Sequence, residues 1–313
     1  MRNKMRSINT LKVLVGAGFT AIMCACPALA AGGKAAELKH QHWHFDGVFG
    51  TFDKEALQRG YQVYETVCSN CHGLEHLAFR NLGQKGGPFH LDACPAGAPA
   101  TLDCSNPNEN PIVKTIAANY KYQVTDGPDE TGEMFERAPI PSDGIPGPYR
   151  NEQQARAANN GALPPDLSLI IKARPHGADY VYSLLTGYED APASVTVAPG
   201  QYYNPYFPGD MSQQMKPEYL DEEGHPREGV EVPPGGVLAM APPLADGMVD
   251  YVDPNTPETV EQYAKDVVEF LAWAAEPKME ERKKLGVMTL AYLLILTGLL
   301  YWSYREIWSK ADR

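Results

Sequence analysis

A stretch near the C-terminus constrains the fold of this chain most. Residues 285–304 are twenty positions without a charged side chain. As a helix rising about 1.5 Å per residue, this stretch would span the roughly 30 Å hydrocarbon core of a bilayer. Aromatic residues that suit membrane interfaces lie in or beside it: Tyr292, Tyr301, Trp302, Tyr304 and Trp308. The pattern predicts one transmembrane helix, rather than a buried core helix, followed by a short tail over residues 305–313.

The N-terminus has the pattern of a secretory signal. Residues 1–30 contain four basic and no acidic side chains, an apolar stretch from Leu11 to Cys26, and a small-x-small cleavage pattern at residues 28–30. We expect cleavage after Ala30; an uncleaved membrane anchor is the alternative. Residues 31–280 then form an exported domain. Basic residues flank both ends of the C-terminal stretch almost equally, so the signal decides the orientation and places the tail in the cytoplasm.

Composition excludes several classes of protein. With 43% hydrophobic and 21% charged residues, the chain is not disordered. Its net charge is −12, and removal of residues 1–30 would make it −16, whereas a nucleic-acid-binding protein of this size is usually basic. Six cysteines are too few for a disulfide-dense scaffold. The 28 glycines and 27 prolines predict that much of the exported domain is loop.

Residues 68–72, Cys-Ser-Asn-Cys-His, form the C-x-x-C-H pattern of covalent c-type haem attachment. Two thiols three positions apart on a helical turn, Cys68 and Cys71, can reach the two vinyl groups of one haem, and His72 can then bind the iron. Attachment takes place in exported compartments, in agreement with the signal. A thioredoxin-like redox pair and a zinc half-site are the alternatives. The pattern occurs once, which predicts one haem c.

The segment before this pattern has helical spacing. Over residues 54–67, Leu57, Tyr61, Tyr64 and Val67 fall on one face, and Asp53 is a suitable N-cap. Gly73 would allow the backbone to approach a flat ring closely.

The sixth iron ligand is not decided by spacing alone. His76 is too close to His72 to reach the opposite face of a haem. The remaining candidates are His90, His176, His225, Met211, Met215 and Met240. Met240 stands out because it lies in an apolar loop stiffened by two prolines, although a methionine in such a stretch is more often part of a core. A His/Met ligand pair raises the haem potential.

At this point the chain resembles the cytochrome c1 family, the haem subunits of the ubiquinol–cytochrome c oxidoreductase complex, in a bacterial form. The similar strings occur in the family's order over most of the expected mature sequence: residues 43–50, 68–72, 161–168, 179–188, 204–209, 240–243, 264–267 and 273–277.

The resemblance implies a mainly helical c-type haem domain with long loop insertions and particular site residues. His72 and Met240 would be the axial ligands of the iron. Arg174 matches an arginine that pairs with a haem propionate, and Tyr180 matches a tyrosine of the haem pocket. A carbonyl near Pro164 or Pro165 would orient the His72 ring through its other nitrogen.

The resemblance also implies a function. The chain would relay single electrons from a Rieske-type iron–sulfur subunit to a cytochrome c, in a membrane complex that includes cytochrome b. It would be part of a quinol–cytochrome c reductase, with no catalytic residue of its own and its haem domain in the periplasm. A free-standing membrane-tethered cytochrome and a haem peroxidase are the alternatives.

The chain departs from the shorter relatives of the family in two places. Residues 210–234 form an added acidic insert that contains Glu218, Asp221, Glu222, Glu223, Glu228 and Glu231. Met211 and Met215 lie in this insert and are therefore discounted as ligands. The second departure is the pair Cys94 and Cys104, for which a disulfide is the simplest expectation in an oxidising compartment and two free thiols are the alternative.

Two further patterns have structural interpretations. His40, His42 and His44 could chelate a metal, but a solvated loop is the expected state. Thr256 and Pro257 have the pattern of a helix start, with Thr256 as N-cap, and we expect the helix to end at Pro277.

Overall fold

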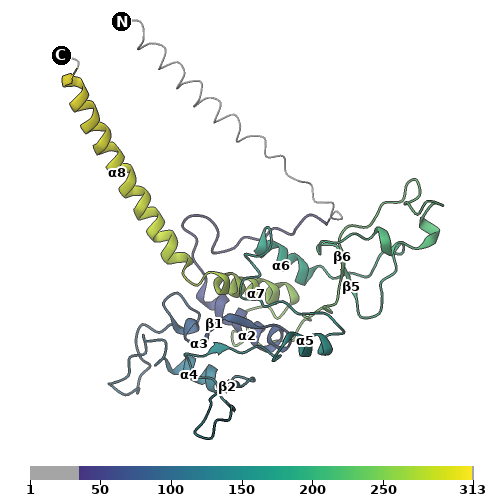
Figure 1. The fold of residues 1–313 in the computed structure, drawn as a ribbon, viewed down its shortest axis with the longest axis horizontal. Helices are drawn as coiled ribbons and strands as arrows, with labels where there is room; N and C mark the ends of the chain where they lie inside the picture. The colour runs from purple at the N-terminus through teal and green to yellow at the C-terminus, as the bar shows by residue number, and fades with distance from the viewer. Residues whose placement is uncertain (1–34, 312–313) are drawn as a thin grey trace.

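The computed structural model describes residues 35–311, so the predicted signal at residues 1–30 lies outside the described residues. Short helices joined by long loops surround a central helix pair, and the mainly helical class expected from the sequence is confirmed (Figure 1). The described α-helices are α2 (Lys54–Thr66), α3 (Phe79–Gly83), α4 (Pro111–Ala118), α5 (Glu152–Ala158), α6 (Gly177–Thr186), α7 (Val260–Ala275) and α8 (Met279–Ala311). Three antiparallel strand pairs join β1 (Leu74–Ala78) to β4 (Gly144–Ile145), β2 (Val124–Asp126) to β3 (Phe135–Arg137), and β5 (Tyr202–Asn204) to β6 (Gly236–Leu238).

Helix α2 forms where the sequence predicts it. The side chain of Asp53 accepts a hydrogen bond from the amide of Ala56, which satisfies one of the free donors of the first turn. Its apolar face packs on α7, with the rings of Tyr61 and Tyr64 5.6 and 5.9 Å from that of Phe270. A glycine is required at the crossing, because a Cβ on Gly60 would lie 2.1 Å from the carbonyl oxygen of Asp266.

A buried ion pair links the same two helices. The guanidinium of Arg59 donates two hydrogen bonds to Asp266, at 2.8 and 2.9 Å, and Asp266 is only 1% exposed. Tyr251 and Gln262 donate to the same carboxylate. These partners compensate for the removal of a charge from water, so the pair ties α2 to α7 without leaving a charge unpaired.

The expected start of α7 is wrong by one turn. Its N-cap is Thr259, whose hydroxyl accepts from the amide of Gln262, and Asp246 accepts from the amide of Val260. The Thr256 hydroxyl instead donates to Asp253, within the preceding turn. The Thr-Pro pattern alone does not distinguish Thr256 from Thr259 as the N-cap. The start of α7 also involves Asp246, which lies 14 residues before Val260 in the chain.

Helix α8 leaves the rest of the described chain and extends away from it (Figure 1). Residues Met279–Ser309 are long and apolar enough to cross a membrane, with a mean hydropathy of 1.8 in the most apolar stretch, none of which is buried. The helix is longer than the uncharged stretch at residues 285–304, and its first turns, residues 279–284, precede that stretch.

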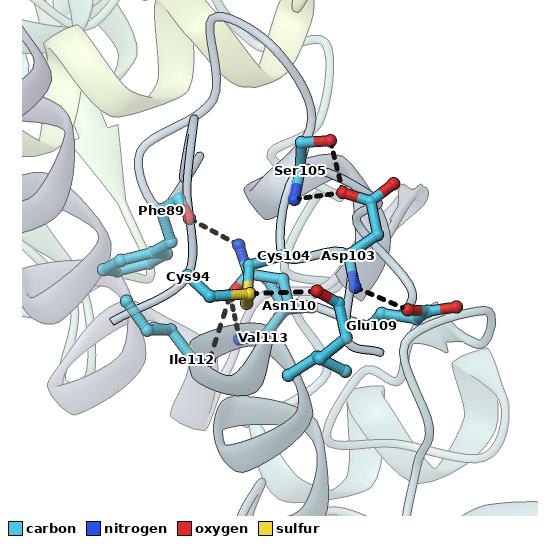
Figure 2. Close-up of a disulfide and its surroundings, with 10 residues drawn as sticks. Phe89, Cys94, Asp103, Cys104, Ser105, Glu109, Asn110, Ile112 and Val113 are labelled. Atoms are coloured by element: carbon cyan, nitrogen blue, oxygen red, sulfur yellow. Dashed lines mark hydrogen bonds between the residues drawn. A yellow bond between two sulfur atoms is a disulfide. The ribbon is translucent and has the colours of Figure 1, made fainter. Parts of the chain in front are cut away.

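A disulfide between Cys94 and Cys104 closes the loop between α3 and α4, with their Cα atoms 5.0 Å apart (Figure 2). The neighbouring Asn110 caps α4, accepting from the amides of Ile112 and Val113, and donates to the carbonyl of Phe89 at 2.8 Å. Asn110 is fully buried. The long loop is therefore held at both ends against the start of α4.

His40, His42 and His44 are exposed and lie in a loop, as the sequence predicts, and two of them also have acidic neighbours. His40 Nδ1 lies 2.7 Å from Asp179, which also accepts from the indole nitrogen of Trp43 at 2.8 Å. His44 Nδ1 lies 3.4 Å from the buried Glu269. The two histidines contact different helices, α6 and α7. Within residues 35–311, no cluster of three or more His, Cys, Asp or Glu side chains could hold a metal ion.

Candidate haem site

The C-x-x-C-H segment forms a single turn at the end of α2. A short 3-10 helix, Cys68–Asn70, follows the helix, and the amides of Cys71 and His72 both donate to the carbonyl of Cys68, at 3.1 and 2.9 Å. Both cysteines are unpaired, and Cys71 is exposed. Two free thiols and an imidazole thus lie at positions 68, 71 and 72 of one turn, which is the arrangement that the pattern requires.

The surroundings of Cys68 disfavour a redox pair. Burial raises the pKa of its thiol to about 12, and the nearby Cys71 adds to the effect. A redox pair needs a thiol whose pKa is lowered.

His72 is oriented by a backbone carbonyl. Its Nδ1 lies 2.7 Å from the carbonyl oxygen of Pro165, one of the two prolines expected to supply this group. Because a carbonyl only accepts, Nδ1 carries the proton and Nε2 keeps a lone pair for a metal. Burial lowers the pKa of His72, which favours the neutral ligand form. The Tyr64 hydroxyl also donates to the His72 carbonyl, at 3.1 Å.

The Pro165 loop is itself held against the attachment turn. The amide of Leu167 donates to the carbonyl of Gly73 at 3.0 Å, and Asp166 accepts from the amides of Glu75 and Ser168. The backbone at Gly73 lies close to other parts of the chain. A Cβ on this residue would lie 3.2 Å from the Asp166 carboxylate and 3.6 Å from the Cα of Gly147. The loop that supplies the Pro165 carbonyl is therefore fixed to Gly73 and Glu75, the residues that follow His72.

The other expected site residues meet through tyrosines. The Tyr188 hydroxyl donates to the Met240 carbonyl at 3.0 Å. Burial raises the pKa of Tyr188, and neighbouring Tyr180 adds to the effect, so the hydroxyl remains a donor. Burial likewise raises the pKa of Tyr180, while the adjacent Arg174 guanidinium opposes the rise. Tyr188 is thus bonded to the Met240 loop, and Tyr180 lies near both Tyr188 and Arg174.

Sequence reasoning missed Tyr188 as a contributor to the site. The residue lies in the similar string at residues 179–188, but nothing in its spacing points to Met240, 52 positions later. Only the folded chain brings them together.

Four of the other five candidate iron ligands are engaged elsewhere, and the fifth, His176, is exposed at the start of α6. His90 lies 3.0 Å from the carbonyl of Gly83, and His225 is near Asp221 in the insert. Met211 and Met215 are 1% and 6% exposed and pack with Val195 and Tyr203 in a small core separate from the main one. Met240 alone among these methionines lies outside that core, in the loop after β6.

The acidic insert leaves the domain through a narrow neck of glycines. A Cβ on Gly209 would lie 2.7 Å from the Cα of Gly236, and one on Gly235 would lie 2.4 Å from the carbonyl oxygen of Asn204. Gly235 has a φ of +87°, which few other residues adopt. Beyond this neck the insert protrudes past β5 and β6, at the end of the domain far from α8 (Figure 1).

A surface hollow adjoins the Met240 loop. It has a volume of about 510 Å³ and is lined by Tyr188, Glu189, Asp190 and Pro242 among others. Glu189 and Asp190 are both exposed. Exposed acidic side chains thus lie both in the insert and beside the Met240 loop.

These residues fit a covalently bound c-type haem. The donor set comprises two unpaired thiols on one turn, a neutral imidazole whose Nδ1 is already hydrogen-bonded, and a thioether in a loop held by Tyr188. Arg174 supplies a positive charge beside Tyr180 for a carboxylate.

The chain is similar to known proteins over most of its length. A model of the Cytochrome C1 family matches residues 43–311. The chain is 44% identical to "Cytochrome c1, heme protein, mitochondrial" of Saccharomyces cerevisiae, over 85% of the chain and 71% of the relative. It is 37% identical to "Cytochrome c1" of Blastochloris viridis, over 100% of the chain and 99% of the relative. It is 40% identical to "Cytochrome b/c1" of Bradyrhizobium diazoefficiens, over 86% of the chain but only 35% of that longer protein.

Proposed function

The chain belongs to the cytochrome c1 family, and we propose on that basis that it relays single electrons from an iron–sulfur protein to a cytochrome c. Members of the family are c-type haem proteins, so the chain is an electron-transfer haem protein with one C-terminal helix able to span a membrane. We place it in a quinol–cytochrome c reductase with cytochrome b and a Rieske-type subunit, which would carry out quinol oxidation. The attachment turn at residues 68–72 carries this proposal.

The chain's own residues hold and tune one haem c, which supplies a one-electron redox couple. Cys68 and Cys71 form the covalent links, and His72 and Met240 bind the iron. The Pro165 carbonyl keeps His72 in the tautomer that binds through Nε2. Arg174 and Tyr180 hold a propionate, and the thioether of Met240 raises the redox potential.

Purification from membranes tests the assignment to a complex. Cytochrome b and an iron–sulfur protein should co-purify with the chain, whereas a free-standing tethered cytochrome would purify without them. The reduced haem should be low-spin and should not bind added ligands; an open sixth position would instead support a peroxidase.

Replacement of Met240 tests the axial ligands. Met240→Leu should keep the covalent haem but lower its potential by a sizeable part of the roughly 0.8 V that axial ligands span. The matched control is Met215→Leu, in the separate small core, which should leave the potential unchanged. An unchanged spectrum and potential in Met240→Leu would show that another group binds the iron.

We further propose that the haem domain lies in the periplasm and the tail at residues 305–313 in the cytoplasm. The haem-attachment pattern supports this orientation because attachment takes place in exported compartments. The predicted signal at residues 1–30 supports it independently. Protease added to intact cells with a permeabilised outer membrane should cleave the acidic insert but leave a tag on the C-terminus intact.

The acidic insert and the hollow beside Met240 support a basic cytochrome c as electron acceptor. All six acidic side chains of the insert that we named are exposed. Opposite surface charge raises the encounter rate of two proteins most strongly at low salt.

Matched charge changes test this docking model. Glu218→Gln, Glu222→Gln and Glu228→Gln together should slow the reduction of a basic cytochrome c at low ionic strength but not at high ionic strength. Asp221 is left in place because it accepts from the amides of Glu223 and His225. Glu130→Gln, Glu133→Gln and Glu152→Gln remove the same charge from other exposed sites. Equal rates in the two triple variants would rule out specific steering by the insert.

A further inference from the structure

The turn at residues 46–50 exposes two adjacent apolar side chains. Val48 is 62% exposed and Phe49 is 85% exposed. On either side of them, Phe45 and Phe52 pack against the main core, with their rings 5.5 Å apart, and Phe45 stacks on Trp43 at 5.7 Å. Single exposed apolar residues are common on protein surfaces. Two at the tip of a turn, between two packed aromatic residues, form a defined apolar projection.

Glycines and backbone hydrogen bonds give this turn a fixed shape. Gly47 has a φ of +74°, and a Cβ on Gly50 would lie 2.1 Å from the carbonyl oxygen of Asp46. The amide of Asp46 donates to Trp43, and that of Thr51 donates to His44, both at 3.1 Å. The exposure of Val48 and Phe49 therefore follows from the backbone of the turn.

The turn is attached to the base of α8. The Lys283 ammonium donates to the carbonyls of Phe45 and Gly50, at 2.6 and 3.0 Å. The amide of Phe52 donates to Glu280 at 2.8 Å. Figure 1 shows this segment, in purple just before α2, beside the first turns of α8. Lys283 lies two residues before the uncharged stretch begins, about 3 Å along the helix axis.

We propose that Val48 and Phe49 are a second membrane contact, inserted in the interfacial layer of the bilayer that α8 spans. The proposal rests on the membrane anchoring of α8. Lipid is the occupant because the turn is bonded to the helix within one turn of the point where its uncharged stretch begins. The exposed basic residue Lys284 beside it suits lipid headgroups, whereas Arg282 is paired with Glu276. Asp46, exposed at the edge of the turn, keeps the contact shallow, within the headgroup layer.

A second contact has a consequence for electron transfer. A domain held only by one helix can tilt and rotate about it, whereas a second contact point beside the helix limits both motions. The projection would therefore set the angle at which the haem domain stands on the membrane.

Spin labelling of the full haem-loaded chain in lipid nanodiscs tests the proposal. With Cys68 and Cys71 bound to haem and Cys94 joined to Cys104, a cysteine introduced by Phe49→Cys is the single reactive thiol of the mature chain. Collision of its nitroxide with oxygen, which partitions into lipid, is compared with collision with a water-soluble nickel chelate. Leu294→Cys, on the exposed surface of α8, is the lipid reference. Phe135→Cys, on the β2–β3 hairpin away from α8, is the aqueous reference (Figure 1).

The label at residue 49 should give an oxygen-to-nickel ratio several-fold above that at residue 135 and below that at residue 294. Val48→Cys should behave in the same way, and the haem spectrum checks that each variant is folded. A residue 49 ratio equal to the aqueous reference, with residue 294 in lipid, would overturn the second contact while leaving the anchor intact. An aqueous value at residue 294 would remove both. Shielding of residue 49 from both reagents would show that protein covers the turn, which also overturns the proposal.

Discussion

The candidate haem site has two sides. The attachment side is the single turn at residues 68–72, whereas the methionine side consists of Arg174, Tyr180, Tyr188 and Met240, which are far apart in the sequence. The first side stands on α2 and α7, the most deeply buried helices of the described chain, with Trp273 and Tyr64 fully buried between them. The second consists of loops around one strand pair, with the tyrosines supplying the contacts. The proposed covalent attachment would thus depend on local sequence and the proposed ligation by Met240 on tertiary contacts, so variants should affect the two sides separately.

The largest effect is expected from loss of the ion pair under the attachment side. Arg59→Met should destabilise the domain by about 3 kcal/mol, because it leaves the buried Asp266 carboxylate without its compensating charge. Denaturant unfolding of the haem-loaded protein measures the change. In Arg150→Met, the control, an exposed pair with Glu136 is lost and about 0–1 kcal/mol is expected. Equal losses in the two variants would mean that the α2–α7 contact does not depend on this pair.

The next largest effect, a local loss of stability, should be confined to the insert. Met211→Ala empties a position that is 1% exposed, at a cost of about 2 kcal/mol. Because Met211 belongs to the small core, we expect faster hydrogen exchange and proteolysis at residues 210–234, with the haem potential unchanged. Met134→Ala, at an exposed position, is the control. A shift in potential would contradict the separation and show that the small core supports Met240.

The smallest effect is expected on the Met240 loop itself. Tyr188→Phe removes one hydrogen bond to the Met240 carbonyl, worth about 1 kcal/mol. The potential and the methionine-ligation spectrum should shift in the direction of Met240→Leu, but by less. Tyr203→Phe is a close control because its hydroxyl donates to a carbonyl of the same region, that of Pro234. If both variants shift the potential alike, Tyr188 has no particular role in positioning Met240.

The features that sequence reasoning predicted correctly depend on neighbours in the chain. The start of α2 is set by Asp53 within its own first turn, and the attachment turn needs only residues 68–72. The expectation that was wrong involves a distant partner. Thr259 rather than Thr256 caps α7, and the amide of Val260 donates to Asp246, 14 residues earlier in the chain.

The methionine side shows the same limit. Spacing alone left six candidates for the sixth ligand, and the family resemblance singled out Met240. Spacing could not separate these candidates because they differ in contacts with distant residues. Met211 and Met215 pack with Val195 and Tyr203, whereas Tyr188 donates to the Met240 carbonyl, 52 positions later in the chain.

The neck of glycines below the insert bears on how such proteins change in length. Asn204 pairs with Gly236, and Gly209 lies against Gly236, so the segment between them starts and finishes at nearly the same point. The entropic cost of closing a loop grows only with the logarithm of its length. Residues can therefore be gained or lost in the exposed part of the insert, beyond the small core of Met211 and Met215, with little effect on the strand pair that precedes Met240. This position can vary in evolution, or accept an engineered reporter domain, while the ligand geometry is retained.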